Sequence, residues 1–232
     1  MNMKLSLSVV FGGSILFFSQ AQAHVSVISP PAMVGTTSTV ELGVGHGCED
    51  KDVARVEVVI PAEMTSIRPR DALFGPATFE KDDTGRITKI IWTKPQGAVL
   101  PADTHYYTVS FRAKMPDTPF KMVYLPTTQF CKADNGDELA VAWDQITTDH
   151  ASHATSKPAP AMLIFPVRYA GWNQFTTQEH LHDMSVFKDA QIVWKGSAAY
   201  SSNPVTTQMI QNDSSLAPLS EIHPGDSFWV KF

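Results

Sequence analysis

The sequence predicts an all-β fold, an antiparallel β-sandwich or barrel followed by a small α+β appendage. Three observations predict it. Apolar residues recur at every second position in short runs, clusters of Pro, Gly, Asp and Asn separate these runs, and no amphipathic helical pattern precedes residue 150. Such alternation is typical of strands that bury one face and expose the other.

Each run in the first part of the chain accounts for one expected strand. In each of them the alternate residues are apolar, and the residues between are mostly polar or small. The expected strands centre on residues 25–27, 40–44, 56–60, 87–92, 107–113 and 139–143.

The pattern changes after the polar, proline-containing segment 147–160, which we interpret as a linker or long loop. The stretch AMLIFPVRY (161–169) predicts a buried strand that ends the first domain. FTTQEHLHDMSVF (175–187) predicts a short helix with Thr176 or Thr177 as its N-cap and Glu179 in its first turn. AQIVWKG and, after the turn HPGD, SFWVKF predict strands. We therefore divide the chain into a sandwich domain, residues 24–167, and an appendage of unassigned role, residues 168–232.

Residues 1–23 have the pattern of a secretory signal peptide. Lys4 supplies a short positive region, an apolar stretch follows, and Ala21-Gln22-Ala23 is an A-x-A cleavage box. The apolar stretch is too short to span a bilayer as a stable helix, and no later apolar run reaches about eighteen residues. We expect cleavage after Ala23, a periplasmic location and a mature chain without a membrane span.

Charge and cysteine content narrow the range of expected partners and the state of the cysteines. The formal net charge is -5 and there is no basic run, so nucleic acid is not an expected partner. Cys48 and Cys131 are the two cysteines, and in an exported chain they predict one disulfide. Metal ligation by this pair is the less favoured interpretation, because no CxxC or CxxxC spacing supports it.

Cleavage after Ala23 would make His24 the first residue of the mature chain. His24 would then carry two nitrogen donors, the α-amine and ring Nδ1, which close a six-membered chelate. The unperturbed pKa of an α-amine is about 7.7–8.0, so a metal displaces its proton readily at neutral pH. Two nitrogens in a plane suit Cu(II), which prefers tetragonal N,O sites. The alternative is a frayed first residue, although the β pattern begins at once.

Several stretches resemble the YcnI-like copper-binding proteins of bacterial exported copper operons. They are AHVSVISPPAMVGTTSTVELGVGHGCED, VEVVIP, ITKIIWTKPQGAVLPADTHYYTVSFRAKMPD and YLPTTQFCKADNGDELAVAWDQI, which together cover about residues 24–165. HGC at 46–48 and the later Cys131 are similar to the Gram-negative branch. The resemblance implies an immunoglobulin-like β-sandwich. It also implies a copper site formed by the N-terminal histidine and one carboxylate near a tryptophan, to which His24 and Trp143 correspond.

The carboxylate of that site has no direct equivalent here. Alignment on Gly35 places Ser38 where Gram-positive relatives have glutamate, and Glu41, three residues on, faces the other side of a regular strand. The remaining substitutes lie beside the expected disulfide: His46, Glu49 and Asp50.

Among these substitutes we favour His46, because imidazole suits copper and the flanking glycines free the backbone. A turn histidine after a strand is the competing interpretation. Trp143 shares its strand face with Leu139 and Val141, so core packing would also explain it.

The remaining histidine pairs are not expected to bind metal. His150 and His153 form HxxH within the predicted linker, where they are expected to be solvated. His180 and His182 form HxH, which would suit a second metal site on a strand, but at the start of a helix these side chains diverge. The methionines are scattered, without the cluster that would favour Cu(I).

Three functions follow from these observations. We favour a periplasmic copper chaperone or sequestration module, not an enzyme, that holds Cu(II) and passes it to another periplasmic or membrane copper protein. An enzyme similar to the lytic polysaccharide monooxygenases is the first alternative, with His105 or His153 as the second histidine of its copper site. A metal-free exported structural or interaction module is the second alternative.

Overall fold

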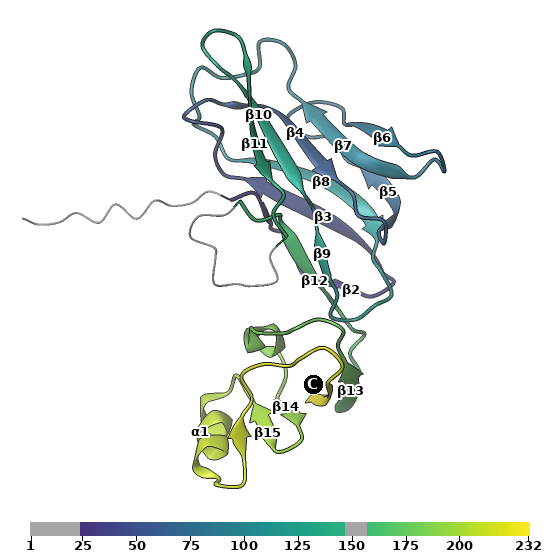
Figure 1. Ribbon diagram of the computed structural model, residues 1–232, viewed down its shortest axis with the longest axis vertical. Coiled ribbons are helices and arrows are strands. Elements are labelled where there is room, and N and C mark those ends of the chain that lie inside the picture. The colour runs from purple at the N-terminus through teal and green to yellow at the C-terminus, as the bar shows by residue number, and fades with distance from the viewer. Residues whose placement is uncertain (1–23, 147–156) are drawn as a thin grey trace, which may run out of the picture.

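The computed structural model describes residues 24–146 and 157–232. A β-sandwich occupies one end of the molecule and a smaller appendage the other (Figure 1). The expected signal peptide, His150 and His153 lie outside the described residues. No helix among the described residues is long and apolar enough to cross a membrane.

Two antiparallel sheets form the sandwich, as the alternation predicts. The first has the strand order β1-β3-β8-β5 and the second β11-β10-β4-β7-β6. The strands of the first sheet are β1 (Ser26–Val27), β3 (Thr37–Val44), β8 (Tyr107–Lys114) and β5 (Thr65–Pro69). Those of the second are β11 (Glu138–Trp143), β10 (Thr127–Lys132), β4 (Val53–Val59), β7 (Ile87–Thr93) and β6 (Thr78–Lys81).

The core lies between these two sheets and is built from the alternate residues of their strands. In β8 the buried residues are Tyr107, Val109, Phe111 and Ala113, while the residues between them are exposed or half-buried. Apolar residues of β3, β4 and β7 complete the same cluster. The predicted alternation therefore marks the inward faces correctly, because burying one face is what stabilises each strand.

Strand β10 was not predicted, and its inward face explains why. Its inward residues are Thr127, Gln129 and Cys131, each 1% exposed. Two of them are polar, so the apolar period of two that identifies a half-buried strand is absent.

A third, small sheet joins the sandwich to the appendage. It has the order β2-β12-β9, with β2 (Ala32–Met33), β12 (Ala161–Phe165) and β9 (Met122–Tyr124). Strand β12 is the buried strand predicted within 161–169. Its pairing with β2 is parallel, which departs from the otherwise antiparallel pattern of the sandwich.

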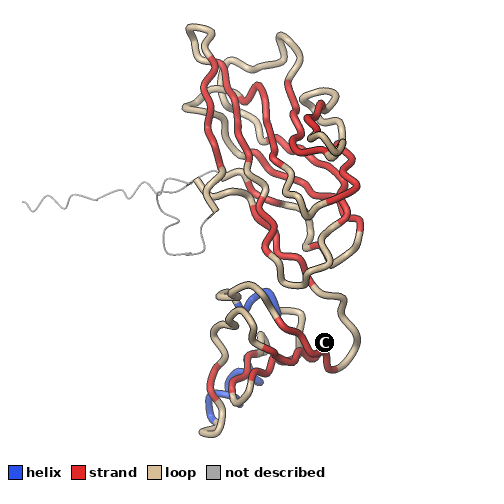
Figure 2. The backbone as a smooth tube through the Cα atoms, turned by 45° about the vertical axis from the view of Figure 1, so that its right-hand side comes forward, coloured by secondary structure: helices blue, strands red, loops and turns tan. Residues whose placement is uncertain are grey.

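The appendage contains one five-stranded sheet and the described helices (Figure 2). The strands, in sheet order, are β13 (Trp172–Thr176), β17 (Ser227–Lys231), β14 (Ile192–Lys195), β15 (Ala198–Tyr200) and β16 (Ala217–Pro218). Helix α1 spans Pro204–Asn212 and a 3-10 helix, η2, spans Met184–Phe187. Strands β14 and β17 correspond to the two strands predicted from AQIVWKG and SFWVKF.

The helix expected over 175–187 is wrong for most of its length. Residues 175 and 176 end β13, Gln178 and Glu179 form a bend, and the only helical part of the segment is η2, whose N-cap is Asp183. The hydroxyl of Thr177 accepts a hydrogen bond from the backbone N–H of Glu179 (2.9 Å), and Leu181 pairs with Ile222. Thr177 therefore forms a local turn rather than a helix cap, and pairing with a distant segment fixes the chain beyond it.

Helix α1 was missed although its start carries a local signal. The side chain of Asn203 accepts hydrogen bonds from the backbone N–H groups of Val205 and Thr206, and Pro204 is the first helical residue. Asparagine at the N-cap followed by proline is a favoured helix start.

The sandwich also contributes to the core of the appendage. Phe120, between β8 and β9, is 1% exposed, and its ring lies 5.5 Å from that of Phe175 and 5.5 Å from that of Phe228. Leu163 of β12 packs against the same cluster. These contacts attach the appendage to the sandwich.

Candidate metal centre

His24 lies just before β1, at the start of the described chain. The ring of Trp143 is next to it, with 5.2 Å between the ring centroids and an interplanar angle of 68°. Nε2 of His24 is buried and has no hydrogen-bond partner among the described residues. The structure thus brings together the two residues that the sequence assigned to one site.

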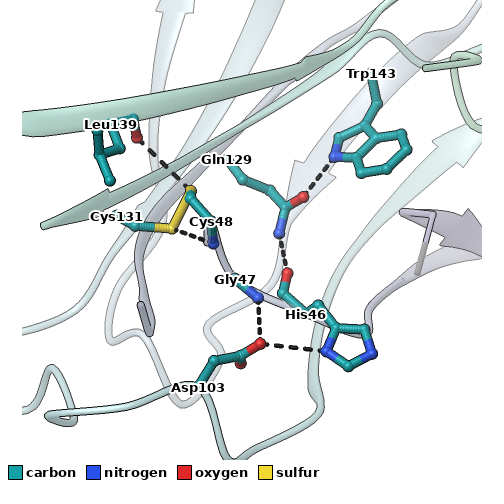
Figure 3. The surroundings of a disulfide bond; sticks show 8 residues. All are labelled: His46, Gly47, Cys48, Asp103, Gln129, Cys131, Leu139 and Trp143. Atoms are coloured by element: carbon teal, nitrogen blue, oxygen red, sulfur yellow. Dashed lines mark hydrogen bonds and ion pairs between the residues drawn. A yellow bond between two sulfur atoms is a disulfide. The ribbon is translucent and has the colours of Figure 1, made fainter. Parts of the chain in front are cut away.

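A buried glutamine connects Trp143 to the loop that follows β3 (Figure 3). The indole N–H of Trp143 donates a hydrogen bond to Oε1 of Gln129. Nε2 of Gln129 donates to the backbone carbonyl of His46 at 2.5 Å. Because Gln129 is 1% exposed and uses both ends of its amide, it fixes the indole relative to the His46 backbone.

The imidazole of His46 is oriented by a carboxylate that sequence reasoning did not find. Nδ1 of His46 lies 3.3 Å from Oδ2 of Asp103, which also accepts the backbone N–H of Gly47 at 2.8 Å. The His46 side chain is 62% exposed, whereas that of Asp103 is 9% exposed. Asp103 therefore occupies Nδ1 and leaves Nε2 of His46 as the accessible donor, an arrangement common among metal-binding histidines.

The predicted disulfide is confirmed and holds this loop. Cys48 is bonded to Cys131 of β10, with 5.8 Å between their Cα atoms. Between His46 and Cys48 only glycine fits, because a Cβ on Gly47 would lie 1.7 Å from the carbonyl oxygen of Lys51. The disulfide at Cys48 and the close contact of Gly47 with Lys51 thereby fix the backbone next to His46.

The structure also shows where the expected carboxylate ligands lie relative to His24. The carbonyl of Glu41 accepts the backbone N–H of Ile28 (2.9 Å), which is four residues along the chain from His24. At about 3.3 Å per residue this separates the Glu41 and His24 backbones by about 13 Å. Glu49 and Asp50 form the exposed turn after Cys48, with φ angles of 49° and 67°. The structure connects His46 to Trp143 through Gln129. Among the described hydrogen bonds, none joins Glu41, Glu49 or Asp50 to Gln129, although the Asp50 carbonyl accepts the backbone N–H of Asp103 at 2.9 Å.

A buried ion pair anchors the segment that carries Asp103. Nζ of Lys94 lies 2.5 Å from Oδ2 of Asp52, and the two side chains are 4% and 0% exposed. The phenol of Tyr107 donates to Oδ1 of the same carboxylate at 2.8 Å, and the backbone N–H of Leu100 donates to Oδ2 at 2.7 Å. Burial, with the neighbouring Asp52, raises the pKa of the Tyr107 phenol. The network holds residues 94–107, and with them Asp103, against the start of β4.

His105, the described histidine proposed for an enzymatic copper site, has other contacts. Its Nδ1 lies 2.8 Å from the Thr104 hydroxyl, and its ring stacks on that of Tyr107 with centroids 6.1 Å apart. Its alternative, His153, is outside the described residues.

Comparisons with known proteins address the family and the fold. A family model described as a domain of unknown function (DUF1775) matches residues 24–164. No curated protein matches.

Among solved structures, an uncharacterized protein from Nocardia farcinica, described as having an immunoglobulin-like fold, is 23% identical with a TM-score of 0.50 and covers 62% of this chain and 99% of its own. A cohesin module from a Clostridium perfringens family 33 glycoside hydrolase is 14% identical with a TM-score of 0.35, covering 62% and 95%. The Nocardia structure confirms the expected immunoglobulin-like sandwich, and the cohesin likeness is too low to support an argument.

Proposed function

The chain belongs to the DUF1775 family, and on that premise we propose that it is an exported copper-binding protein. One Cu(II) ion binds at the amino terminus that cleavage after Ala23 creates, in the periplasm. The protein acts as a copper chaperone or sequestration module in copper homeostasis and passes the ion to another periplasmic or membrane copper protein. It is not an enzyme.

The observation that carries this proposal is the position of His24 against Trp143. Nε2 of His24 is buried, so Nδ1 is the ring nitrogen suited to chelation together with the α-amine of the processed chain. A buried polar atom without a partner costs about 1–3 kcal/mol. If His24 served packing alone, an apolar side chain could fill the same place without this cost. A histidine is needed at this position if its other ring nitrogen, Nδ1, binds the metal.

His46 supports the proposal as the further ligand. Asp103 engages its Nδ1 and leaves Nε2 accessible. The register of β1 and β3 pairs Ser26 with Gly43, so His24 precedes β1 at the end of this strand pair where the chain leaves β3 toward His46. An imidazole from this loop would add a third nitrogen to the two of His24, a donor set that suits Cu(II).

Isothermal titration with Cu(II) tests the proposal by comparing the processed protein with a variant that retains residues 19–23. The extra residues convert the α-amine of His24 into a peptide nitrogen and move the free amine five residues away from the imidazole. We expect the affinity at this site to fall by more than the roughly 10–100-fold that outer-shell changes cause. The matched control is a processed His24→Ala variant, which keeps the amine and loses the ring. Equal affinity of the processed and extended proteins would contradict the proposal.

The same preparations separate the alternative functions. Copper-dependent oxidation of chitin or cellulose by the processed protein would contradict the chaperone and favour the enzyme. If no Cu(II) bound at the processed terminus, the metal-free structural module would replace both.

A further inference from the structure

Four metal-ligating side chains meet on the surface of the appendage, far along the sequence from His24. They come from two short segments, 180–182 and 221–223, that pair through Leu181 and Ile222. These two residues exchange both backbone hydrogen bonds, at 2.8 and 3.0 Å, and are 5% and 0% exposed. Since neighbours along extended chain point to opposite faces, the residues flanking this inward pair share the outer face. They are His180, His182, Glu221 and His223.

The carboxylate of Glu221 lies among the three imidazoles. Its Oε2 is 3.1 Å from Nε2 of His180 and 3.7 Å from Nδ1 of His182, and its Oε1 is 3.5 Å from Nε2 of His223. One ligand atom from each of His180, Glu221 and His223 can be chosen so that all lie within 4.8 Å of one another. The His180 ring centroid is 3.6 Å from that of His182 and 4.5 Å from that of His223.

We propose that this cluster binds one divalent transition-metal ion of the imidazole-preferring class, Zn(II) or Cu(II). His180, Glu221 and His223 are the primary ligands, and His182 supplies a fourth. Three imidazoles and one carboxylate form a donor set that both ions accept. With metal–ligand distances of about 2.0–2.1 Å, tetrahedral ligands lie about 3.3 Å apart. The separations of the Glu221 oxygens from the three rings fall around that value, so closure on an ion needs only small side-chain movements.

The surroundings of His223 fit this role. Oδ2 of Asp226 accepts the backbone N–H of His223 at 2.8 Å and lies 3.7 Å from its Nδ1. Lys195 forms an ion pair with the same carboxylate and holds it in place. A carboxylate at Nδ1 directs Nε2 of the ring toward Glu221, which is the usual support of a metal-binding histidine.

Packing does not explain why these side chains converge. The exposed fractions of the His180, His182, Glu221 and His223 side chains are 33%, 38%, 44% and 53%. Exposed charge pairs stabilise a fold by about 0–1 kcal/mol, and ordering flexible side chains opposes even that gain. An ion held by all four would account for the arrangement.

The test is a titration of the protein that retains residues 19–23, with Zn(II) alone and with Cu(II) alone. Because the extra residues move the free amine away from the His24 imidazole, the terminal chelate cannot form and bound ions report on the appendage. We expect one equivalent to bind. The His180→Asn/His223→Asn variant should weaken binding by more than about 100-fold, a larger loss than the roughly 10–100-fold that outer-shell changes give. His105→Asn, an exposed histidine of the sandwich, is the matched control and should bind as the parent does.

Each outcome of this titration decides the proposal. Tight binding of either metal, lost in the double variant and kept in the control, supports the site. Absence of binding by the parent, or undiminished binding by the double variant, overturns it. Near-ultraviolet circular dichroism of the double variant checks that the appendage keeps its fold, and Glu221→Gln gives a second, independent reduction in affinity.

Discussion

The imidazole of His24 meets the indole of Trp143 edge to face, with 5.2 Å between the ring centroids. Trp143 is the last residue of β11 and also packs against the sandwich core together with Leu139 and Val141. Core packing and a place beside the candidate centre were competing interpretations of this tryptophan, and the structure shows that the side chain packs on the core and also lies beside His24. Because packing fixes its position, Trp143 would report on an ion bound at His24.

Cu(II) bound at His24 is therefore expected to quench the fluorescence of Trp143, because a paramagnetic ion quenches indole emission at short range. The measurement uses the processed His180→Asn/His223→Asn protein, so that the appendage site does not contribute. Trp143→Phe should remove most of the quenching, whereas Trp172→Phe, on the appendage sheet, should leave it. Equal quenching in all three proteins would place the ion elsewhere.

Replacement of Gln129 by leucine should weaken both the fold and the candidate centre. The change removes the hydrogen bonds to the Trp143 indole and to the His46 carbonyl and leaves both groups without these partners. We expect a loss of about 1–3 kcal/mol in the free energy of unfolding and a drop of about 10–100-fold in Cu(II) affinity, as for other supporting residues of metal sites. Urea denaturation and calorimetric titration measure the two effects. Unchanged copper affinity in a folded variant would separate Gln129 from the site.

Asp52→Asn should destabilise the sandwich strongly. The substitution leaves the Lys94 ammonium, 4% exposed, without its counter-charge. Removing one partner of a buried pair costs about 3–5 kcal/mol. Asp134→Asn is the matched control, because Asp134 pairs with Lys51 at an 89% exposed position and such a surface pair contributes about 0–1 kcal/mol. Denaturation curves of the two variants should differ accordingly, and similar losses would argue against a stabilising role for the buried pair.

Tyr107 is expected to make the protein sensitive to alkaline pH. Its folded-state pKa is raised above the ordinary value of 10.0, mainly by burial and then by Asp52. The folded state therefore holds the phenol proton more tightly than the unfolded state does. The stability that this difference provides is complete below about pH 10 and is lost as the pH rises above it. Tyr107→Phe should be less stable at neutral pH, because the hydrogen bond to Asp52 is lost, yet its stability should fall less steeply above pH 10.

Denaturation midpoints measured from pH 7 to about pH 11.5 would show this difference. The range extends above pH 10 because the ordinary pKa of tyrosine is about 10. Tyr169→Phe is the control, since Tyr169 is 70% exposed. If Tyr107→Phe and the parent declined in parallel at alkaline pH, other groups would be responsible for the loss.

The sequence predicted the structure correctly wherever a single physical rule acts along a short stretch of the chain. Alternation identified the inward faces of β3 and β8, because strands that bury one face need apolar residues there. The presence of two cysteines identified the disulfide. The rule failed for β10, whose inward Thr127 and Gln129 are polar, and for residues 175–187, where pairing with a distant segment overrode the local helix signal.

By itself, then, the sequence determined the β-sandwich and the Cys48–Cys131 bond, and it singled out His24 as a candidate ligand. Only the tertiary structure decided that Gln129 links Trp143 to His46, that Asp103 orients His46, and that His180 and His182 meet Glu221 and His223. The hydrogen bonds among these residues join positions that are 14 apart for Gln129 and Trp143 and 41 to 83 apart for the others, and strand register and loop docking bring them together. Neither register nor docking is encoded in a local pattern, because both depend on which distant faces are buried against each other.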